Sequence, residues 1–153
     1  MDLTQLSIDE LCGQDFACEC GRTHKVATRR ILIEKGAVAK SAQVLDELGL
    51  AGEALVVCDE NTYAVAGEQV ITVLRDAGRK VRALKLRHQP LHADSAALGD
   101  VLLAMGDDTK VLVAVGSGTI NDTTRMAACR LNLPYIIVGT APSMDGYASS
   151  VSP

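Results

Sequence analysis

The stretch from Val111 to Asp122, VLVAVGSGTIND, runs five apolar residues into a glycine turn and then into a helix-like segment. An unbroken apolar run of this length, bounded by glycine, is typical of a strand that is buried on both faces of a sheet. A helix that starts directly behind such a turn points its unpaired N–H groups into the gap. The stretch therefore predicts a strand, a tight turn and a helix, and it raises the question of what the turn holds.

The same alternation of strand and helix continues on both sides of this stretch. Strands are predicted at 25–34, 54–59, 81–86, 110–115 and 135–139, with helices at 37–48, 62–78, 94–105 and from the glycine turn to Leu131. Apolar strands that are separated by helical crossovers predict an α/β fold with a doubly wound, mostly parallel, Rossmann-like sheet. This makes about five β-α units.

Ligands of such a sheet bind beyond the carboxyl ends of its strands. Three turns of this sequence are expected there: 59–61, 116–119 and 140–143. The last turn begins the segment TAPSMDGYASS (140–150), which is rich in hydroxyl groups. It lies beside the glycine turn if the two preceding strands are neighbours.

The N-terminal part of the chain is organised differently. Ser7 and Glu10 have the spacing of a capping box, which predicts a short helix that ends at Gly13, and a hairpin is expected to turn at Cys20–Gly21. Cys18, Cys20 and His24 are candidate zinc ligands, but a structural zinc site needs four ligands and no second pair follows. We therefore assign no metal here. The expected divisions are 1–30 for helix and hairpin, 31–140 for the β-α units and 141–153 for the ligand loop and hinge.

Composition restricts the kinds of partner. The chain has 153 residues, 48% of them hydrophobic, which is enough for one core; its formal net charge is −4 and its charged residues are dispersed, which argues against nucleic acid. No apolar run reaches the roughly 20 residues that cross a bilayer, and the acidic N-terminus does not resemble a secretory signal, so a cytoplasmic location is expected. The oligomeric state is left open, a homo-oligomer included.

The five cysteines do not predict a disulfide framework, because their number is odd. Cys58 and Cys129 stand in apolar strand and helix patterns and are expected to be buried thiols. His88 and His92 flank Pro90 in a polar connection and are expected to be solvated.

The glycine turn has the composition of a phosphate cradle. Gly116 and Gly118 carry no side chain that would keep an anion from the backbone, and Ser117 and Thr119 add hydroxyl donors. A pyrophosphate fits this description. The dinucleotide fingerprint, however, has a third glycine where this chain has Asn121, so a plain tight turn remains the alternative.

Two acidic residues, Asp145 and Asp59, have two interpretations each, and a third, Asp122, has one. Asp145 is either a contact to a hydroxyl-bearing ligand or a cap of its own turn. Asp59 either binds ribose hydroxyls or caps the following helix, a role that Asn61 also fits. Asp122 is four residues beyond Gly118, and with Arg125 it is most simply an i, i+3 pair on the surface.

Two motifs bring a known family into view. The segments VGSGTINDTTR (115–125) and LNLPYIIVGTAPSMDGYASS (131–150) together resemble the glycerol-1-phosphate dehydrogenases, in the superfamily of iron-containing alcohol dehydrogenases, glycerol dehydrogenase and dehydroquinate synthase. The likeness covers essentially the whole chain, since CECGRTHKVATRRILIEKGAV (18–38) and VVCDENTY (56–63) resemble the family's opening hairpin and second strand.

The resemblance implies a metal-dependent enzyme that interconverts dihydroxyacetone phosphate and sn-glycerol 1-phosphate, a phosphorylated ketone and polyol, with NAD or NADP. It places the pyrophosphate loop on Gly116, Ser117, Gly118, Thr119 and Ile120, a second cofactor segment on Thr140, Ala141, Pro142 and Ser143, the substrate contact on Asp145, a further cofactor serine on Ser149 and, less securely, the ribose-end acid on Asp59.

The sequence departs from the family's pattern in three ways. Arg125 stands where many relatives have lysine, and Gly139 precedes Thr140 where proline is common. Relatives hold a divalent metal, Zn, Ni or Fe, with an aspartate and two histidines of a helical C-terminal domain, whereas this sequence ends at Pro153. We therefore expect no catalytic or metal-binding residue here and an inactive chain. The alternatives are a non-catalytic NAD(P)-binding module, a dehydroquinate-synthase-like protein and another polyol dehydrogenase.

Overall fold

The computed structural model describes residues 5–143 and Tyr147. The chain divides into two compact units, Met1–Ala37 and Val38–Pro153. Asp145 and Ser149, two of the predicted ligand contacts, lie outside the described residues. None of the helices that the structure describes is long and apolar enough to cross a membrane.

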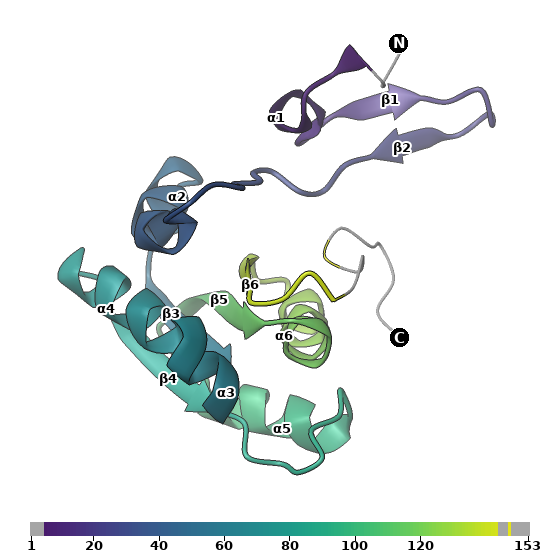
Figure 1. The fold of residues 1–153 in the computed structure, drawn as a ribbon. Coiled ribbons are helices and arrows are strands. Elements are labelled where there is room, and N and C mark those ends of the chain that lie inside the picture. Colours follow the sequence, from purple (N-terminus) through teal and green to yellow (C-terminus); the bar gives the residue numbers. More distant parts are fainter. Residues whose placement is uncertain (1–4, 144–146, 148–153) are drawn as a thin grey trace. The chain divides into compact units, whose positions relative to one another are not determined.

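The first unit consists of a short helix and a β-hairpin (Figure 1). Helix α1 (Ile8–Leu11) has the predicted capping box, because the Ser7 N–H donates to the Glu10 carboxylate over 2.8 Å and the Glu10 N–H donates to the Ser7 hydroxyl over 3.3 Å. Strands β1 (Asp15–Ala17) and β2 (Thr23–Lys25) pair antiparallel. The hairpin is confirmed.

The predicted strand at 25–34 is not formed. Strand β2 ends at Lys25, and residues 26–36 contain no strand. The apolar and polar residues of this segment alternate as in a strand, but none of the described strands pairs with it. A strand is stable only when its backbone groups bond to a neighbour, so a suitable pattern without a partner leaves the chain extended and unpaired.

The second unit is the predicted doubly wound α/β fold. Its sheet contains β3 (Glu53–Cys58), β4 (Val81–Lys85), β5 (Thr109–Gly116) and β6 (Tyr135–Gly139), in the order β4-β3-β5-β6. All three pairings are parallel, with Val56 opposite Val113 and Ala114 opposite Ile137. The sheet therefore has four strands instead of the five that the sequence predicts.

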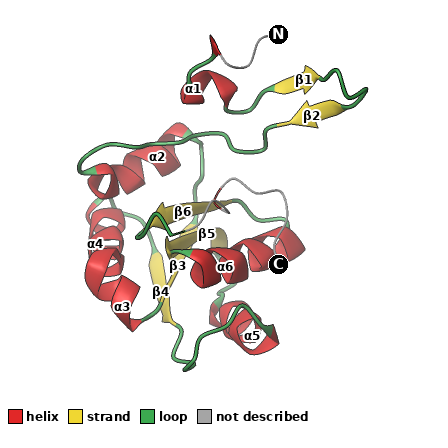
Figure 2. Ribbon diagram, turned by 45° about the vertical axis from the view of Figure 1, so that its right-hand side comes forward, coloured by secondary structure: helices red, strands yellow, loops and turns green. Residues whose placement is uncertain are grey.

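Helices cover both faces of this sheet, as Figure 2 shows. One face carries the 3₁₀ turn Ala37–Lys40, α2 (Ser41–Glu47) and α4 (Glu68–Asp76), and the other carries α5 (Ser95–Ala104) and α6 (Gly118–Leu131). The helix predicted at 62–78 starts earlier, with α3 (Glu60–Thr62), and passes through a π-helical turn (η3, Tyr63–Gly67) before α4.

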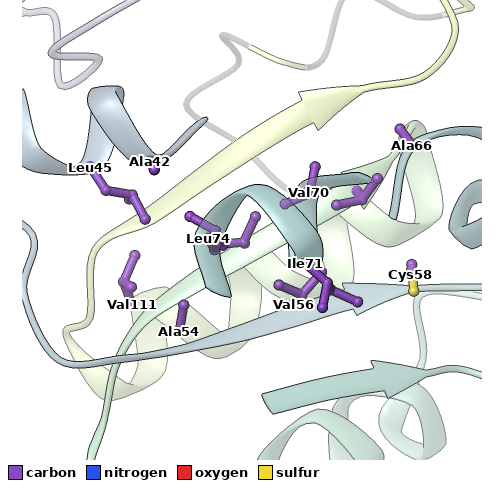
Figure 3. Close-up of a cluster of buried hydrophobic side chains, with 12 residues drawn as sticks. Ala42, Leu45, Ala54, Val56, Cys58, Ala66, Val70, Ile71, Leu74 and Val111 are labelled. Carbon is purple, nitrogen blue, oxygen red and sulfur yellow. The ribbon is translucent and has the colours of Figure 1, made fainter. Parts of the chain in front are cut away.

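The two layers of the core arise because alternate side chains of each central strand point to opposite faces of the sheet. Residues 54, 56 and 58 of β3 and 111, 113 and 115 of β5 pack against α2 and α4, as Figure 3 shows for one cluster. The intervening residues, 55, 57, 112 and 114, pack against α5 and α6. Alternate side chains of a strand point to opposite faces, so a run that is apolar throughout is buried on both.

Cys129 is not buried, which contradicts its prediction as a buried thiol. Cys58 is buried as expected, but Cys129 is exposed, and all five cysteines are free. The buried stripe of α6 ends with Ala127 and Ala128, so residue 129 lies about 100° further around the helix and faces solvent.

Candidate functional site

The carboxyl ends of three adjacent strands bring the three predicted turns to one edge of the sheet. Val57 of β3 is opposite Ala114 of β5, and Gly116 at the end of β5 is opposite Gly139 at the end of β6. Turns 59–61, 116–119 and 140–143 follow these strands directly. The predicted neighbourhood of the glycine turn and the TAPS segment is therefore confirmed, and this edge is the place where parallel sheets bind ligands.

Gly116 permits α6 to pack closely on β5. A Cβ atom added at this residue would lie 2.7 Å from both the Cβ and the Cγ1 of Ile120, one turn into the helix. No real Cβ contact is that short. The space that a side chain at Gly116 would need is therefore filled by Ile120 of α6. This contact brings the start of α6 close to the end of β5.

The start of α6 lacks a side-chain cap. Ser117 is the N-cap residue, yet it makes no side-chain capping hydrogen bond, and the first turn contains no acidic residue. Helices α3 and α5 differ, because Asp59 and Asp94 accept hydrogen bonds from their first amides. The first N–H groups of a helix attract anions, and this 14-residue helix has no carboxylate at its N-cap residue or in its first turn.

The second predicted segment is tied to this turn by the backbone. The N–H of Thr140 donates to the carbonyl of Gly116 over 3.1 Å. Pro142 and Ser143 are exposed, and the Tyr147 hydroxyl donates to the carbonyl of Ala141 over 2.7 Å. The structure thus brings together the residues predicted for a diphosphate at 116–120 and those of the segment 140–143.

Asp59 is at the same edge and caps α3. Its Oδ1 accepts a hydrogen bond from the Thr62 N–H over 2.7 Å, and the Thr62 hydroxyl accepts one from the Asp59 N–H over 2.9 Å. Of the two interpretations in the sequence analysis, the N-cap is the one that these contacts show. Asn61 does not take that role, because it lies inside α3.

The Asp122–Arg125 pair is present but is not on the surface as predicted. Its nitrogen and oxygen are 3.2 Å apart, and the two side chains are only 14% and 13% exposed. Burial raises the pKa of the neighbouring Tyr135 phenol, an effect that the Arg125 charge opposes. The i, i+3 spacing identified the pair, but its burial depends on tertiary packing, and Tyr135 at the start of β6 lies close to both charged groups.

Two buried polar atoms on α6 were not singled out by the sequence. Asn121 and Thr124 are fully buried, and neither the Asn121 Oδ1 nor the Thr124 Oγ1 has a hydrogen-bond partner among the described residues. Asn121 is the residue that replaces the third glycine of the dinucleotide fingerprint. The sequence predicted only that both residues lie in a helix. Whether a side-chain oxygen is buried without a partner depends on the packing around that helix, which the sequence did not show.

His88 and His92 are exposed, as predicted. The His88 Nε2 lies 2.8 Å from an Asp100 carboxylate oxygen, a contact that the sequence did not indicate. Elsewhere, Cys18, Cys20 and His24 of the hairpin place their ligand atoms within 4.8 Å of one another. This is the only group of three histidine, cysteine or carboxylate ligands that gathers among the described residues.

Several known proteins are similar to this chain in sequence and in fold. The family model for iron-containing alcohol dehydrogenases matches residues 32–153. A glycerol-1-phosphate dehydrogenase [NAD(P)+] from Halalkalibacterium halodurans is 37% identical over 140 residues, which are 89% of this chain and 35% of the relative. Another, from Geobacillus stearothermophilus, is 30% identical over 153 residues, covering 96% and 37%.

A solved structure is similar to this chain in its fold. The crystal structure of glycerol dehydrogenase from Schizosaccharomyces pombe superposes with a TM-score of 0.69 at 28% identity, over 76% of this chain and 28% of that one. The chain thus spans about a third of the length of the curated relatives it matches. Since the family model covers most of its residues, the chain belongs to the iron-containing alcohol dehydrogenase family.

Proposed function

We propose that this chain is the coenzyme-binding part of an NAD(P)-dependent glycerol-1-phosphate dehydrogenase. The observation that carries the proposal is the uncapped start of α6, held beside the segment 140–143 by the Thr140–Gly116 hydrogen bond. The names of the relatives support the same activity. The substrate pair is dihydroxyacetone phosphate and sn-glycerol 1-phosphate, and the bound nicotinamide supplies or accepts the hydride.

The residues at the edge of the sheet have distinct roles in this proposal. The N–H groups of Gly118, Thr119 and Ile120 bind the diphosphate of the coenzyme, and the hydroxyls of Ser117 and Thr119 donate further hydrogen bonds. Ser117, Gly118 and Thr119 are only partly buried, which supports their access to a ligand, whereas the Ile120 side chain is buried against the sheet.

The second segment completes the coenzyme site. Thr140, Ala141, Pro142 and Ser143 line the other side of the diphosphate, and Ser149 is a further contact. Asp145 accepts hydrogen bonds from the hydroxyl groups of the substrate. Asp59, which follows β3 at the same edge, accepts hydrogen bonds from ribose hydroxyls of the coenzyme.

The family name implies a metal, but no group of three histidine, cysteine or carboxylate side chains gathers among the described residues of the sheet edge. Ligand side chains gather only in the hairpin within the part of the chain that the structure describes. We therefore assign no catalytic step to a metal bound by residues 116–143. Their part is to bind and orient the coenzyme.

The test is a substitution that places a branched side chain in the cradle. Gly118 has no positive φ, so a β-branched residue is compatible with its backbone. Gly118→Val is expected to weaken binding of NADH and NADPH at least tenfold, because the branched side chain lies where the diphosphate approaches. Isothermal titration calorimetry with each coenzyme measures the change.

The matched control is Gly99→Val in α5. A Cβ atom at Gly99 meets nothing within 4 Å, and this glycine lies in a helix that does not form the edge turns. The control is expected to bind coenzyme as the unchanged chain does. Coenzyme affinity that is equal in all three proteins would contradict the proposed cradle.

A further inference from the structure

Three side chains that can bind a metal converge at the turn of the N-terminal hairpin. Figure 1 shows the two strands of this hairpin, β1 and β2. Cys18 follows β1, Cys20 lies in the turn, and His24 is the middle residue of β2. The Cys20 Sγ is 3.2 Å from the His24 Nε2, and the ligand atoms of all three residues lie within 4.8 Å of one another. Two sulfurs and an imidazole at this separation are a recognised donor set for zinc.

The backbone of the hairpin places these side chains together. Phe16 is the cross-strand partner of His24, and Cys18 lies two residues after Phe16, so Cys18 and His24 face the same side of the hairpin. The Cys18 N–H donates to the Arg22 carbonyl over 2.9 Å, which extends the pairing by one step.

The turn and one aromatic contact complete the arrangement. Gly21, at φ +81°, donates its N–H to the Cys18 carbonyl over 3.0 Å, which folds Cys20 back toward the strands. The rings of Phe16 and His24 are 5.6 Å apart between centroids and tilted by 30°, so the imidazole packs against an aromatic face. The ligand geometry is therefore set by hydrogen bonds and packing of the hairpin itself.

We propose that Cys18, Cys20 and His24 bind one Zn²⁺ ion, with His24 coordinating through Nε2 and solvent in the fourth position. Zinc bonds of about 2.3 Å to sulfur and about 2.0 Å to nitrogen, at tetrahedral angles, put sulfur and nitrogen about 3.5 Å apart and two sulfurs about 3.8 Å apart. The observed 3.2 Å contact and the 4.8 Å limit bracket these separations, so small side-chain rotations suffice.

The chemistry of the ligands selects the ion. Thiolates are soft ligands and favour zinc or Cu(I), whereas Mg²⁺ and Ca²⁺ require oxygen ligands. Three protein ligands with one open position are a known zinc arrangement, so the absence of a fourth side chain does not exclude the ion.

The described part of the hairpin unit has little hydrophobic core of its own. None of residues 5–37 is fully buried, and Ile33 is 80% exposed. Units of fewer than about 40 residues rarely bury enough apolar surface to be stable and usually depend on metals, disulfides or association. A zinc ion that joins β1, the turn and β2 would supply this missing stabilisation.

The decisive measurement is zinc stoichiometry. The 153-residue chain, purified with a reductant and dialysed after exposure to Zn²⁺, is expected to retain about one zinc per chain by inductively coupled plasma mass spectrometry. Cys18→Ser, Cys20→Ser and His24→Ala are each expected to retain at least tenfold less. The matched control, Cys129→Ser, changes an exposed cysteine of α6 and is expected to retain the full amount.

Two further measurements identify the ligands and check the fold. Co²⁺ bound in place of zinc is expected to show the near-ultraviolet charge-transfer band of cobalt–thiolate bonds, which weakens in Cys20→Ser and is kept in Cys129→Ser. The thermal transition of the parallel sheet, followed by circular dichroism, is expected to survive in all four variants. A variant that loses zinc but keeps this transition has lost a ligand and not its fold.

Three outcomes would overturn the proposal. The first is equal zinc content in the unchanged chain and in Cys18→Ser or Cys20→Ser. The second is cobalt binding without a thiolate band. The third is a Cys18–Cys20 disulfide, found by thiol counting and mass spectrometry in the chain purified with the reductant. Coenzyme titration is a separate measurement, so failure of the zinc proposal leaves the proposed coenzyme site untouched.

Discussion

Gly116 illustrates how a single missing side chain positions the site. Its Cβ position lies 2.7 Å from Ile120, so any other residue would push α6 away from β5. The lack of a side chain at Gly116 was expected to admit an anion, whereas the structure shows a packing contact with Ile120 there. Among the turn glycines, Gly118 is therefore the one on which the proposed diphosphate cradle depends.

Cys58 is the residue whose ionisation most clearly reports on the core. It is fully buried at the end of β3, and burial raises the pKa of its thiol to about 11, from about 9 in the unfolded chain. Between pH 9 and 11 the folded chain keeps a proton that the unfolded chain has lost. The free energy of unfolding is therefore expected to fall as pH rises through this window, by on the order of 2 kcal/mol, and to be insensitive to Cys58 below it.

Urea unfolding at a series of pH values from below 9 to 11 measures this slope. Cys58→Ala is the control: its cavity lowers stability at every pH, but it removes the titrating thiol and is expected to flatten the alkaline decline. The same decline in both proteins would show that other groups cause it.

At the scale of elements, the two helices at the sheet edge are capped in opposite ways. Helix α3 receives the Asp59 carboxylate, while α6 starts at a serine that makes no side-chain cap. Both helices begin at an N-cap residue of a favoured type, Asp59 for α3 and Ser117 for α6. Residue type alone therefore does not predict which helix has a side-chain cap. The hydrogen bonds do, and they point to α6 as the end that is available to an anion.

The cap of α3 predicts a pair of substitutions with different effects. Asp59→Ala removes the acceptor of the Thr62 N–H and is expected to cost about 1 kcal/mol of stability, measured by urea unfolding. Asp59→Asn keeps an oxygen in that position and is expected to restore most of this loss. A full loss in Asp59→Asn would show that the charge, and not the hydrogen bond, stabilises the helix.

The same variant tests the proposed ribose contact. If Asp59 faces the ribose, its charge repels the 2′-phosphate of NADP, and Asp59→Asn is expected to raise the affinity for NADPH relative to NADH by roughly tenfold. Titration with both coenzymes measures the ratio. An unchanged ratio would restrict Asp59 to its capping role.

On the scale of the whole molecule, the parallel sheet is the platform that brings distant residues together. Residues 59, 116 and 140 are far apart in sequence, yet the order β3-β5-β6 places the turns that contain them along one edge. Both faces of β3 and β5 are covered by helices, so this edge is rigidly supported.

The layered core predicts where the fold is sensitive. Leu74 of α4 is fully buried against the sheet, and Leu74→Ala is expected to lower the free energy of unfolding by about 2–5 kcal/mol, because it leaves a cavity. Leu103 of α5 is 87% exposed, and Leu103→Ala is the matched control, with an expected change within about 0.5 kcal/mol. Equal effects of the two substitutions in urea unfolding would contradict the described core.

Much of this fold is predictable because the relevant information is local. The strands at 54–59, 81–86, 110–115 and 135–139 and the helices between them follow from apolar periods of two and of about 3.6. The capping box at Ser7 and Glu10 and the turn at Cys20–Gly21 depend on residues that are near neighbours in the chain. The coenzyme residues at 116–120 and 140–143 were identified by motif and resemblance, and their assignment stays a proposal.

Features that depend on distant partners were not predictable in this way. The segment 25–34 has a strand pattern but pairs with none of the described strands. Cys129 lies on the exposed side of α6, and the Asp122–Arg125 pair is largely buried. The amino-acid order alone therefore predicts most of the helices and strands and their succession along the chain, since backbone preferences and periodicity act over a few residues. It does not decide whether a strand pattern such as 25–34 finds a partner and forms a strand. Strand pairing and helix packing settle which side chains are buried, paired or brought within reach of one ion, because these distances exist only after the chain has folded.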